Sequence, residues 1–183
     1  MSQALMVIDM QNGFLREGNL ASSTCLEVLP AVVDEVQHAL AAGDHVIFTA
    51  DTHETDDKEF EVFPTHCVRG THEAELADEL KAFLGRDKVH LIKKRRYSAM
   101  FETELEGLLH RYSIARVRIC GVCTDICVMH TTADLRNRDI HVTVVANATA
   151  TFDAPEHGAE EIREQSLAHM SSILGALIER AEV

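Results

Sequence analysis

The regular alternation of two apolar patterns along the chain is the feature that most constrains its fold. Short apolar runs predict a buried strand over 4–10, further strands over 45–51, 89–94, 115–122 and 140–147, and a short final strand near 176–180. Helical spacing predicts helices over 26–43, 71–85, 103–112, 125–138 and 155–175. This order is typical of βαβ units. We therefore expect a three-layer α/β/α fold around a central, mostly parallel sheet.

Length and charge limit the partners that this chain can have. Its 183 residues fit one domain, over 1–183, with a sizeable core. A net charge of −13 repels phosphate backbones, so we expect no nucleic acid partner. The N-terminal letters MSQALMVIDM show no signal-peptide pattern, and no apolar run is long enough to span a membrane. We therefore expect a cytoplasmic protein without disulfides, which agrees with the odd count of five cysteines.

Reactive side chains follow four of the predicted strands at their carboxyl ends. Asp9 ends the first strand, Asp51 and then His53 follow the second, and Lys94 ends the third. The fourth strand runs into RICGVCTDICVMH (118–130), which holds three cysteines. Because the carboxyl ends of parallel strands lie at one edge of the sheet, these groups are expected to converge there.

The three cysteines allow a metal site, a redox pair or a single nucleophile. A zinc site needs a second pair of ligands at similar spacing, and none is present. A thioredoxin-type motif places its first cysteine at a helix start, whereas Cys120 lies inside a strand. On this stretch alone, packing of all three as small buried side chains stays open.

Cys127 is the candidate nucleophile, since it falls in the first turn of the predicted helix. Thr124 or Asp125 is expected to cap that helix, and the free N–H groups there favour a thiolate. The backbone N–H groups of Cys123 and Cys127 can also form an oxyanion hole.

Asp9 and Lys94 are the candidate partners of this thiol. A carboxylate at the end of a buried central strand is partly desolvated, which raises its pKa and suits it to take the thiol proton. Lys94 would supply positive charge nearby. Each also has a simpler interpretation, because Asp9 can cap a turn and Lys94 belongs to the charged run KKRR.

Three motifs together resemble those of the cysteine hydrolases of the isochorismatase-like superfamily, and within it the nicotinamidases. They are VIDMQNGF (7–14), KKRRYSAMFETEL (93–105) and GVCTDICV (121–128). The resemblance runs nearly end to end and implies the isochorismatase-like (Rossmann-like) fold. It also implies Asp9 as the acid and base, Lys94 as the catalytic lysine and Cys127 as the attacking residue. A cis peptide between Val122 and Cys123 is implied as well.

The resemblance further implies a metal site in DTHETDDKEFEVFPTHCVRGT (51–71). Asp51, His53 and His66 match the expected ligands, and Glu59 matches an extra acidic ligand that some members have. This set suits Zn²⁺, or Mn²⁺ or Fe²⁺ if waters complete an octahedron. The ion would hold the pyridine nitrogen of nicotinamide so that its carboxamide faces the thiol.

The implied reaction is hydrolysis of nicotinamide to nicotinate and ammonia through a thioester, a step of NAD salvage. Phe14, Leu20 and Tyr97 are candidates to line the substrate pocket, and a homo-oligomer, a dimer or tetramer, is expected. The main alternative is an amidase of the same superfamily that acts on a carbamoyl or ureido compound. A vinyl-ether hydrolase would lack the nucleophilic cysteine, and a non-catalytic binding protein would not need Asp9, Lys94 and Cys127 together.

Overall fold

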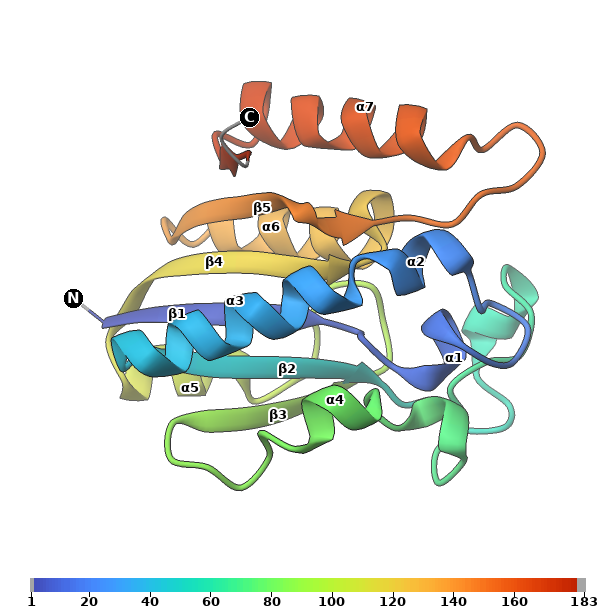
Figure 1. Cartoon of the computed structure of the whole chain (residues 1–183), viewed down its shortest axis with the longest axis horizontal. Helices are drawn as coiled ribbons and strands as arrows, with labels where there is room; N and C mark the ends of the chain where they lie inside the picture. Colours follow the sequence, from blue (N-terminus) through green and yellow to red (C-terminus); the bar gives the residue numbers. More distant parts are fainter. Residues whose placement is uncertain (1, 181–183) are drawn as a thin grey trace.

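A six-stranded parallel sheet forms the centre of the protein, with strand order β3-β2-β1-β4-β5-β6 (Figure 1). A computed structural model describes residues 2–180. The strands are β1 (Ser2–Ile8), β2 (His45–Asp51), β3 (Val89–Lys94), β4 (Ile114–Val122), β5 (His141–Ala150) and β6 (Leu177–Glu179). All six predicted strands are present, within a few residues of their expected bounds.

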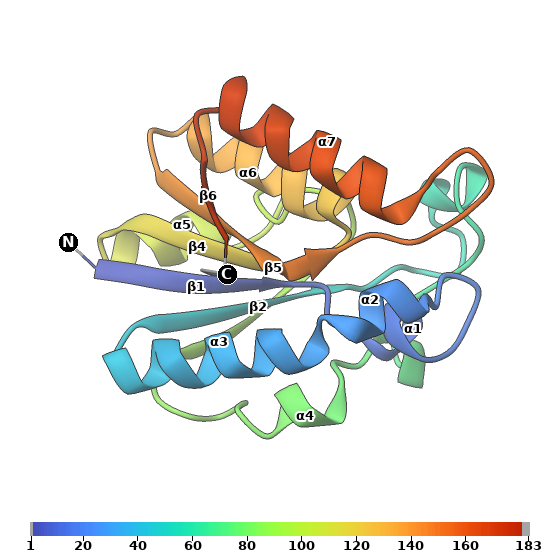
Figure 2. The same cartoon turned by 45° about the horizontal axis from the view of Figure 1, so that its top comes forward.

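Helices cover both faces of this sheet, so the predicted three-layer α/β/α architecture is confirmed (Figure 2). The α-helices are α1 (Asn12–Leu15), α2 (Ser23–Glu27), α3 (Leu29–Ala42), α4 (Asp78–Lys81), α5 (Leu105–Arg111), α6 (Met129–Arg136) and α7 (Ala159–Ser172). Three further helical turns are η1 (Lys58–Glu61), η2 (His72–Ala74) and the π-helical η3 (Thr124–Val128). Within residues 2–180, no helix has the length and apolar character needed to cross a bilayer.

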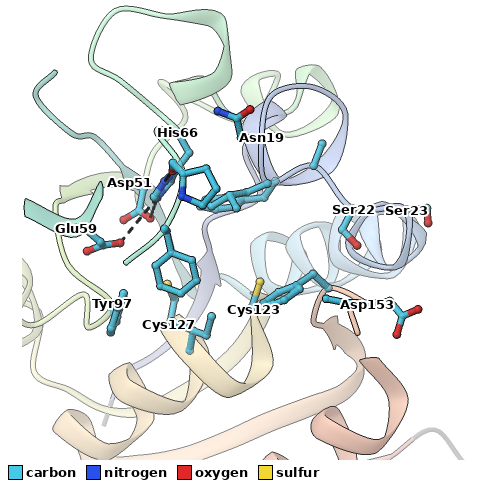
Figure 3. A pocket seen from close by; sticks show the side chains of 18 residues that line it. Asn19, Ser22, Ser23, Asp51, Glu59, His66, Tyr97, Cys123, Cys127 and Asp153 are labelled. Carbon is cyan, nitrogen blue, oxygen red and sulfur yellow. Dashed lines mark hydrogen bonds and ion pairs between the residues drawn. The ribbon is translucent and has the colours of Figure 1, made fainter. Parts of the chain in front are cut away.

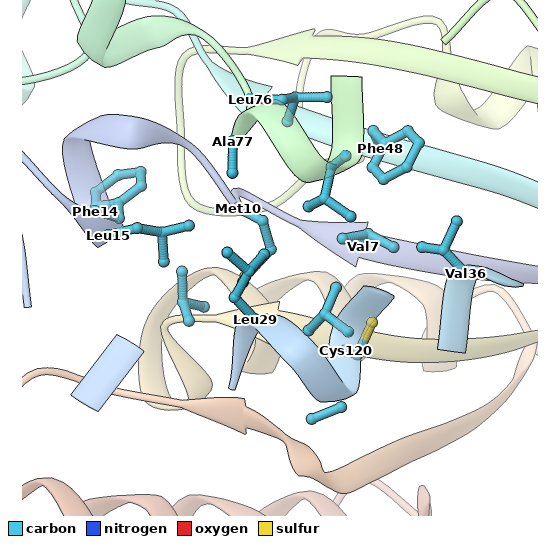
Figure 4. Close-up of a cluster of buried hydrophobic side chains, with 14 of the residues drawn as sticks. Val7, Met10, Phe14, Leu15, Leu29, Val36, Phe48, Leu76, Ala77 and Cys120 are labelled. Atoms are coloured by element: carbon cyan, nitrogen blue, oxygen red, sulfur yellow. The ribbon is translucent and has the colours of Figure 1, made fainter. Parts of the chain in front are cut away.

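Two apolar clusters hold the helical layers against the sheet. Val7 and Phe48 pack with Val36 of α3 on one face (Figure 4). Ile47 and Met170 belong to the cluster on the other face. Every residue of β2 is buried, as expected for a central strand of a parallel sheet. This packing fixes the carboxyl ends of the strands, where the candidate residues lie.

The helix expected over 71–85 is mostly wrong, since only η2 and α4 form there. The intervening backbone pairs instead with the segment after β1. Asn12 donates its N–H to the carbonyl of Glu75 (3.0 Å), and Ala77 donates to that of Met10 (2.9 Å). These contacts use backbone groups that a helix would need, so a long-range pairing overrides the local helical pattern.

The helix expected over 26–43 is split into α2 and α3 at Val28. Pro30 lies in the first turn of α3, where its missing N–H leaves no donor unsatisfied. Gly43 ends α3 in the left-handed conformation with φ 78°, as its position after the helical pattern predicts.

Gly121 lets β1 and β4 approach closely beside the candidate site. Its φ is +107°, and a Cβ there would lie 2.1 Å from the carbonyl oxygen of Ile8. The peptide bond between Val122 and Cys123, just after Gly121, is cis, as the resemblance implies. This close approach sets Asp9, which follows Ile8, against the turn that carries Cys127.

Candidate active site

A cavity of about 620 Å³ lies at the carboxyl edge of the sheet (Figure 3). Its lining includes Cys127, Cys123, Asp51 and His66. The three residues expected to line a substrate pocket, Phe14, Leu20 and Tyr97, also line this cavity. The predicted convergence of strand ends therefore produces a single pocket with both apolar and reactive walls.

Lys94 lies at the centre of a buried group that reaches the cavity through Cys127 and Asp51. Its Nζ is 2.7 Å from Oδ2 of Asp9 and 2.5 Å from Oδ1 of Asp51. The same Nζ donates to Sγ of Cys127 at 3.5 Å. Reactive atoms of Asp9, Asp51 and Cys127 all lie within 4.8 Å of one another. Three residues from distant parts of the chain, Asp9, Lys94 and Cys127, thus form one buried group.

Burial and nearby charges shift the pKa values of the two carboxyl groups, Asp9 and Asp51, in opposite directions. Burial raises the pKa of Asp9, and the Lys94 ammonium offsets this only in part. Burial would also raise the pKa of Asp51, but the charge of Lys94 and contacts from His53 lower it to about 2. Burial opposes the charge on Lys94, yet the two carboxylates keep its pKa well above the usual range. Asp9 is therefore the carboxyl group better suited to exchange a proton.

The resting state of Cys127 differs from the sequence expectation of a thiolate. Burial raises the pKa of its thiol well above the ordinary value, and Lys94 offsets this in part, so the sulfur stays protonated. Neither Thr124 nor Asp125 caps the helix, since Cys123 occupies the N-cap position and makes no side-chain cap. Desolvation of the sulfur outweighs the field of one short turn, and a base is needed to remove its proton.

The backbone N–H of Cys123, in the turn that carries Cys127, is available to a ligand. The carbonyl of Cys123 accepts from Ile126 (3.2 Å) and Val128 (3.1 Å), while Cys127, between them, is not among its donors. The N–H of Cys123 donates to no group within residues 2–180. Cys120 lies apart, fully buried, with its Sγ 3.8 Å from the carbonyl of Met6.

Thr49 holds the carboxylate of Asp9 and Gln11 holds the backbone of Asp51, and neither residue was predicted from the sequence. The Thr49 hydroxyl donates to Oδ1 of Asp9 at 2.6 Å and accepts from the Asp9 N–H at 3.1 Å. Gln11 donates to the carbonyl of Asp51 at 2.9 Å and accepts from its N–H at 2.7 Å. The period of two along β2 places Thr49 on the same face as Asp51, which is the signal that could have identified it.

Asp51, His53, Glu59 and His66 form a second buried group, the four-ligand cluster. One donor atom from each lies within 4.8 Å of the others. Nε2 of His53 is 3.7 Å from Asp51 Oδ2 and 3.8 Å from Glu59 Oε1. Nε2 of His66 lies 3.9 Å and 3.8 Å from the same two atoms. Both imidazoles therefore direct Nε2 toward the same point between two carboxylates.

The chemistry of this cluster fits a divalent cation. Nε2 of His53 is fully buried and has no hydrogen-bond partner within residues 2–180. Burial and the nearby Asp51 raise the pKa of Glu59 to about 7, so the positive charge around Glu59 does not offset its burial. Two imidazoles with two carboxylates suit Zn²⁺, Mn²⁺ or Fe²⁺. The structure therefore supports the predicted metal site at these four residues.

Asp57 supports the four-ligand cluster from behind and was not foreseen from the sequence. Its Oδ2 lies 3.2 Å from Nδ1 of His53, and its Oδ1 accepts the N–H of Glu59 at 2.9 Å. Arg96 donates to the same Oδ1 at 2.7 Å. Carboxylates that contact the outer nitrogen of a ligating histidine orient its ring.

Comparison with known proteins shows an end-to-end likeness. A model of the isochorismatase domain family matches residues 3–182. The crystal structure of the nicotinamidase/pyrazinamidase PncA of Bacillus subtilis is 33% identical, with a TM-score of 0.88, over 97% of this chain and 99% of that one. The pyrazinamidase of Pyrococcus horikoshii in complex with zinc is 27% identical, with a TM-score of 0.86, over 99% of this chain and 100% of that one.

Two further similarities extend the range of activities among its relatives. The N-carbamoylsarcosine amidase of Thermoplasma acidophilum is 27% identical, with a TM-score of 0.86, over 100% of this chain and 99% of that one. An Arabidopsis thaliana protein whose name calls it a probable inactive nicotinamidase is 32% identical over 85% of this chain and 84% of its own.

Proposed function

This chain belongs to the isochorismatase family, and we propose that it is a metal-assisted cysteine amidohydrolase that converts nicotinamide to nicotinate and ammonia. One observation carries the proposal. Cys127 lines the same pocket as Asp51, Glu59 and His66 of the four-ligand cluster. Behind them, Lys94 joins the two groups, because its Nζ pairs with both Asp9 and Asp51. Relatives named as nicotinamidases or pyrazinamidases support the choice of substrate.

The first half of the reaction uses Asp9 as the base. Because the thiol of Cys127 is protonated at rest, Asp9 takes its proton as the sulfur attacks the carboxamide carbon. Lys94 keeps the two anionic groups close, since its Nζ contacts both Asp9 and Cys127. The C–N bond then breaks, and Asp9 returns the proton to the departing nitrogen, which leaves as ammonia.

The second half releases the acid. Asp9 takes a proton from a water molecule while the oxygen of that water attacks the thioester carbon. The C–S bond then breaks, and the sulfur regains a proton from Asp9. In both halves the oxyanion accepts from the backbone N–H groups of Cys123 and Cys127. The N–H of Cys123 donates to no backbone carbonyl within residues 2–180. The side chain of Cys123 has no part in either step.

The four-ligand cluster orients the substrate in this proposal. A divalent ion held by Asp51, His53, Glu59 and His66 supplies, when bound, a Lewis-acid contact for the pyridine nitrogen. Phe14, Leu20 and Tyr97 are among the residues that line the cavity, where the flat ring would lie. Cys127 borders the same cavity, so a ring held at the cluster can present its carboxamide to the sulfur.

A carbamoyl amidase is the second candidate, favoured by the likeness to N-carbamoylsarcosine amidase. The two candidates differ in their need for the pyridine nitrogen. Only a substrate with that nitrogen gains from an ion at the four-ligand cluster, so a chelator should suppress hydrolysis of nicotinamide more than that of a carbamoyl compound.

Ammonia release from nicotinamide, pyrazinamide and an N-carbamoyl amino acid, each with and without chelator, tests the proposal. A direct test is needed because one relative is named as inactive. Cys127→Ala should abolish ammonia release, whereas Cys123→Ala keeps the backbone N–H and should retain activity. Nicotinamide turnover by Cys127→Ala would contradict the mechanism, and turnover of the carbamoyl compound alone would favour the second candidate.

A further inference from the structure

The loop between β5 and α7 forms one wall of the active-site cavity. Phe152, Asp153 and Ala154 from this loop line the cavity. The loop has little regular structure of its own beyond a bridge in which Ala154 and His157 exchange backbone hydrogen bonds of 3.0 and 2.9 Å. Its place against the cavity must therefore depend on side-chain contacts.

His157 makes the contacts that join this loop to the nucleophile turn. Its ring stacks on Phe152, with centroids 4.1 Å apart and planes 1° from parallel. Nδ1 lies 2.9 Å from the carbonyl oxygen of Phe152, and Nε2 lies 3.1 Å from Oδ2 of Asp125. Asp125 belongs to η3, the same turn as Cys127. One imidazole thus links the cavity wall to the element that carries the nucleophile.

Both ring nitrogens of His157 face groups that only accept hydrogen bonds. The carbonyl of Phe152 is an acceptor, and the carboxylate of Asp125 offers acceptor oxygens as well. Each ring nitrogen lies within hydrogen-bond distance of its acceptor, at 2.9 Å and 3.1 Å. A phenylalanine at this position would keep the flat stack but lose both donors, which separates the stacking role from the linking role.

We propose that His157 is a positioning residue that holds Phe152 as a fixed wall of the substrate pocket and so sets the affinity for aromatic amides. This inference rests on the proposed amide hydrolysis. One face of the Phe152 ring is covered by His157, while Phe152 also borders the cavity together with Phe14. Flat substrates gain from a rigid aromatic wall because it is already ordered before they bind.

Steady-state kinetics on nicotinamide test the inference with His157→Phe, Phe152→Leu and the double variant. An aromatic contact is worth about a tenfold change in affinity, so each single variant should raise KM about 10-fold with kcat within about twofold. Because His157 acts through Phe152, the double variant should be no worse than either single variant. His169→Phe, at an exposed site on α7, is the matched control and should leave KM unchanged.

An unchanged KM in His157→Phe, additive effects in the double variant, or a loss confined to kcat would each overturn the inference. If His157→Phe does not fold, His157→Gln keeps one amide donor and should give a smaller rise in KM. Thermal unfolding of each variant identifies a loss that comes from the fold alone.

A second measurement separates this inference from the proposed function. Cys127 is alkylated by N-phenyliodoacetamide, which carries a flat ring, and by iodoacetamide, which does not. The rate ratio between the two should fall about 10-fold in His157→Phe, whether or not any amide is hydrolysed. An unchanged ratio overturns the role of His157, while absent amide turnover in the unaltered protein overturns only the proposed function.

Discussion

Nζ of Lys94 and Oδ2 of Asp9 form an ion pair of 2.7 Å in which both side chains are fully buried. Lys94 also contacts Asp51 at 2.5 Å, so one ammonium serves two carboxylates. Charges removed from water in this way are tolerated only when they are paired. The pair therefore links the stability of the fold to the proton chemistry that we propose for the site.

Replacing Lys94 with Met should destabilise the protein as well as abolish activity. The change leaves Asp9 and Asp51 without a counter-charge in a buried site, and loss of one partner of such a group costs about 3–5 kcal/mol. Chemical denaturation measures this loss. Lys93→Met, at the exposed neighbouring position, is the control and should change stability by less than about 0.5 kcal/mol. Equal stability of the two variants would contradict the paired arrangement.

The pH dependence of kcat/KM should show an acidic limb displaced to higher pH than is usual for an aspartate. Burial raises the pKa of Asp9, and the base must be ionised to accept the thiol proton, so activity falls as pH falls through this raised pKa. The measurement is made at saturating metal so that the ligands do not titrate. Asp9→Asn should lose activity at every pH, and a wild-type limb at or below the ordinary aspartate range would refute the assignment.

A bound divalent ion should stabilise the fold through the four-ligand cluster. Ligand at about 100 times its Kd raises the free energy of unfolding by about 2.7 kcal/mol. Zn²⁺ is therefore expected to raise the midpoint of thermal unfolding, and His66→Asn should remove most of this shift. His72→Asn lies on the same loop but outside the cluster, with a side chain 61% exposed, and should keep it. A zinc-induced shift that survives in His66→Asn would place the ion elsewhere.

Gly121→Ala should destabilise the protein by about 3 kcal/mol or more, because it combines left-handed strain with overlap. The added Cβ would lie 2.1 Å from the carbonyl oxygen of Ile8, at a φ of +107°. Gly107→Ala is the matched control, since nothing lies within 4 Å of its Cβ in α5 and alanine favours the helix. Similar stabilities of the two variants would show that β1 and β4 can separate without cost.

Two stacked histidines at the opposite end of the sheet should make stability depend on pH. Nδ1 of His45 lies 3.1 Å from Nε2 of His90, and burial lowers the pKa of both rings. A pKa that is lower in the folded state means that the unfolded chain binds protons more readily. The stability is therefore complete above the unfolded pKa and is lost as pH falls through the folded pKa. Urea denaturation at saturating metal should show that the free energy of unfolding decreases as pH falls through this range. His90→Gln should weaken this pH dependence, and an unchanged dependence in His90→Gln would refute the coupling.

Local sequence patterns were sufficient to predict the layers and the place of the site. The apolar runs that lead to Asp9, Asp51 and Lys94 form strands β1, β2 and β3, and their ends meet because parallel strands share a carboxyl edge. The same local patterns failed at 71–85, where backbone pairing with the segment after β1 replaced most of a helix. The expected oligomer stays a prediction.

The sequence by itself determined which residue types stand at the strand ends, because periodicity and motif spacing are local properties of the chain. Only the tertiary structure decided their chemical state. Burial keeps the thiol of Cys127 protonated and raises the pKa of Asp9, and both effects depend on the residues packed around them. Thr49 and His157 likewise act through contacts with residues distant in sequence, which no local pattern specifies.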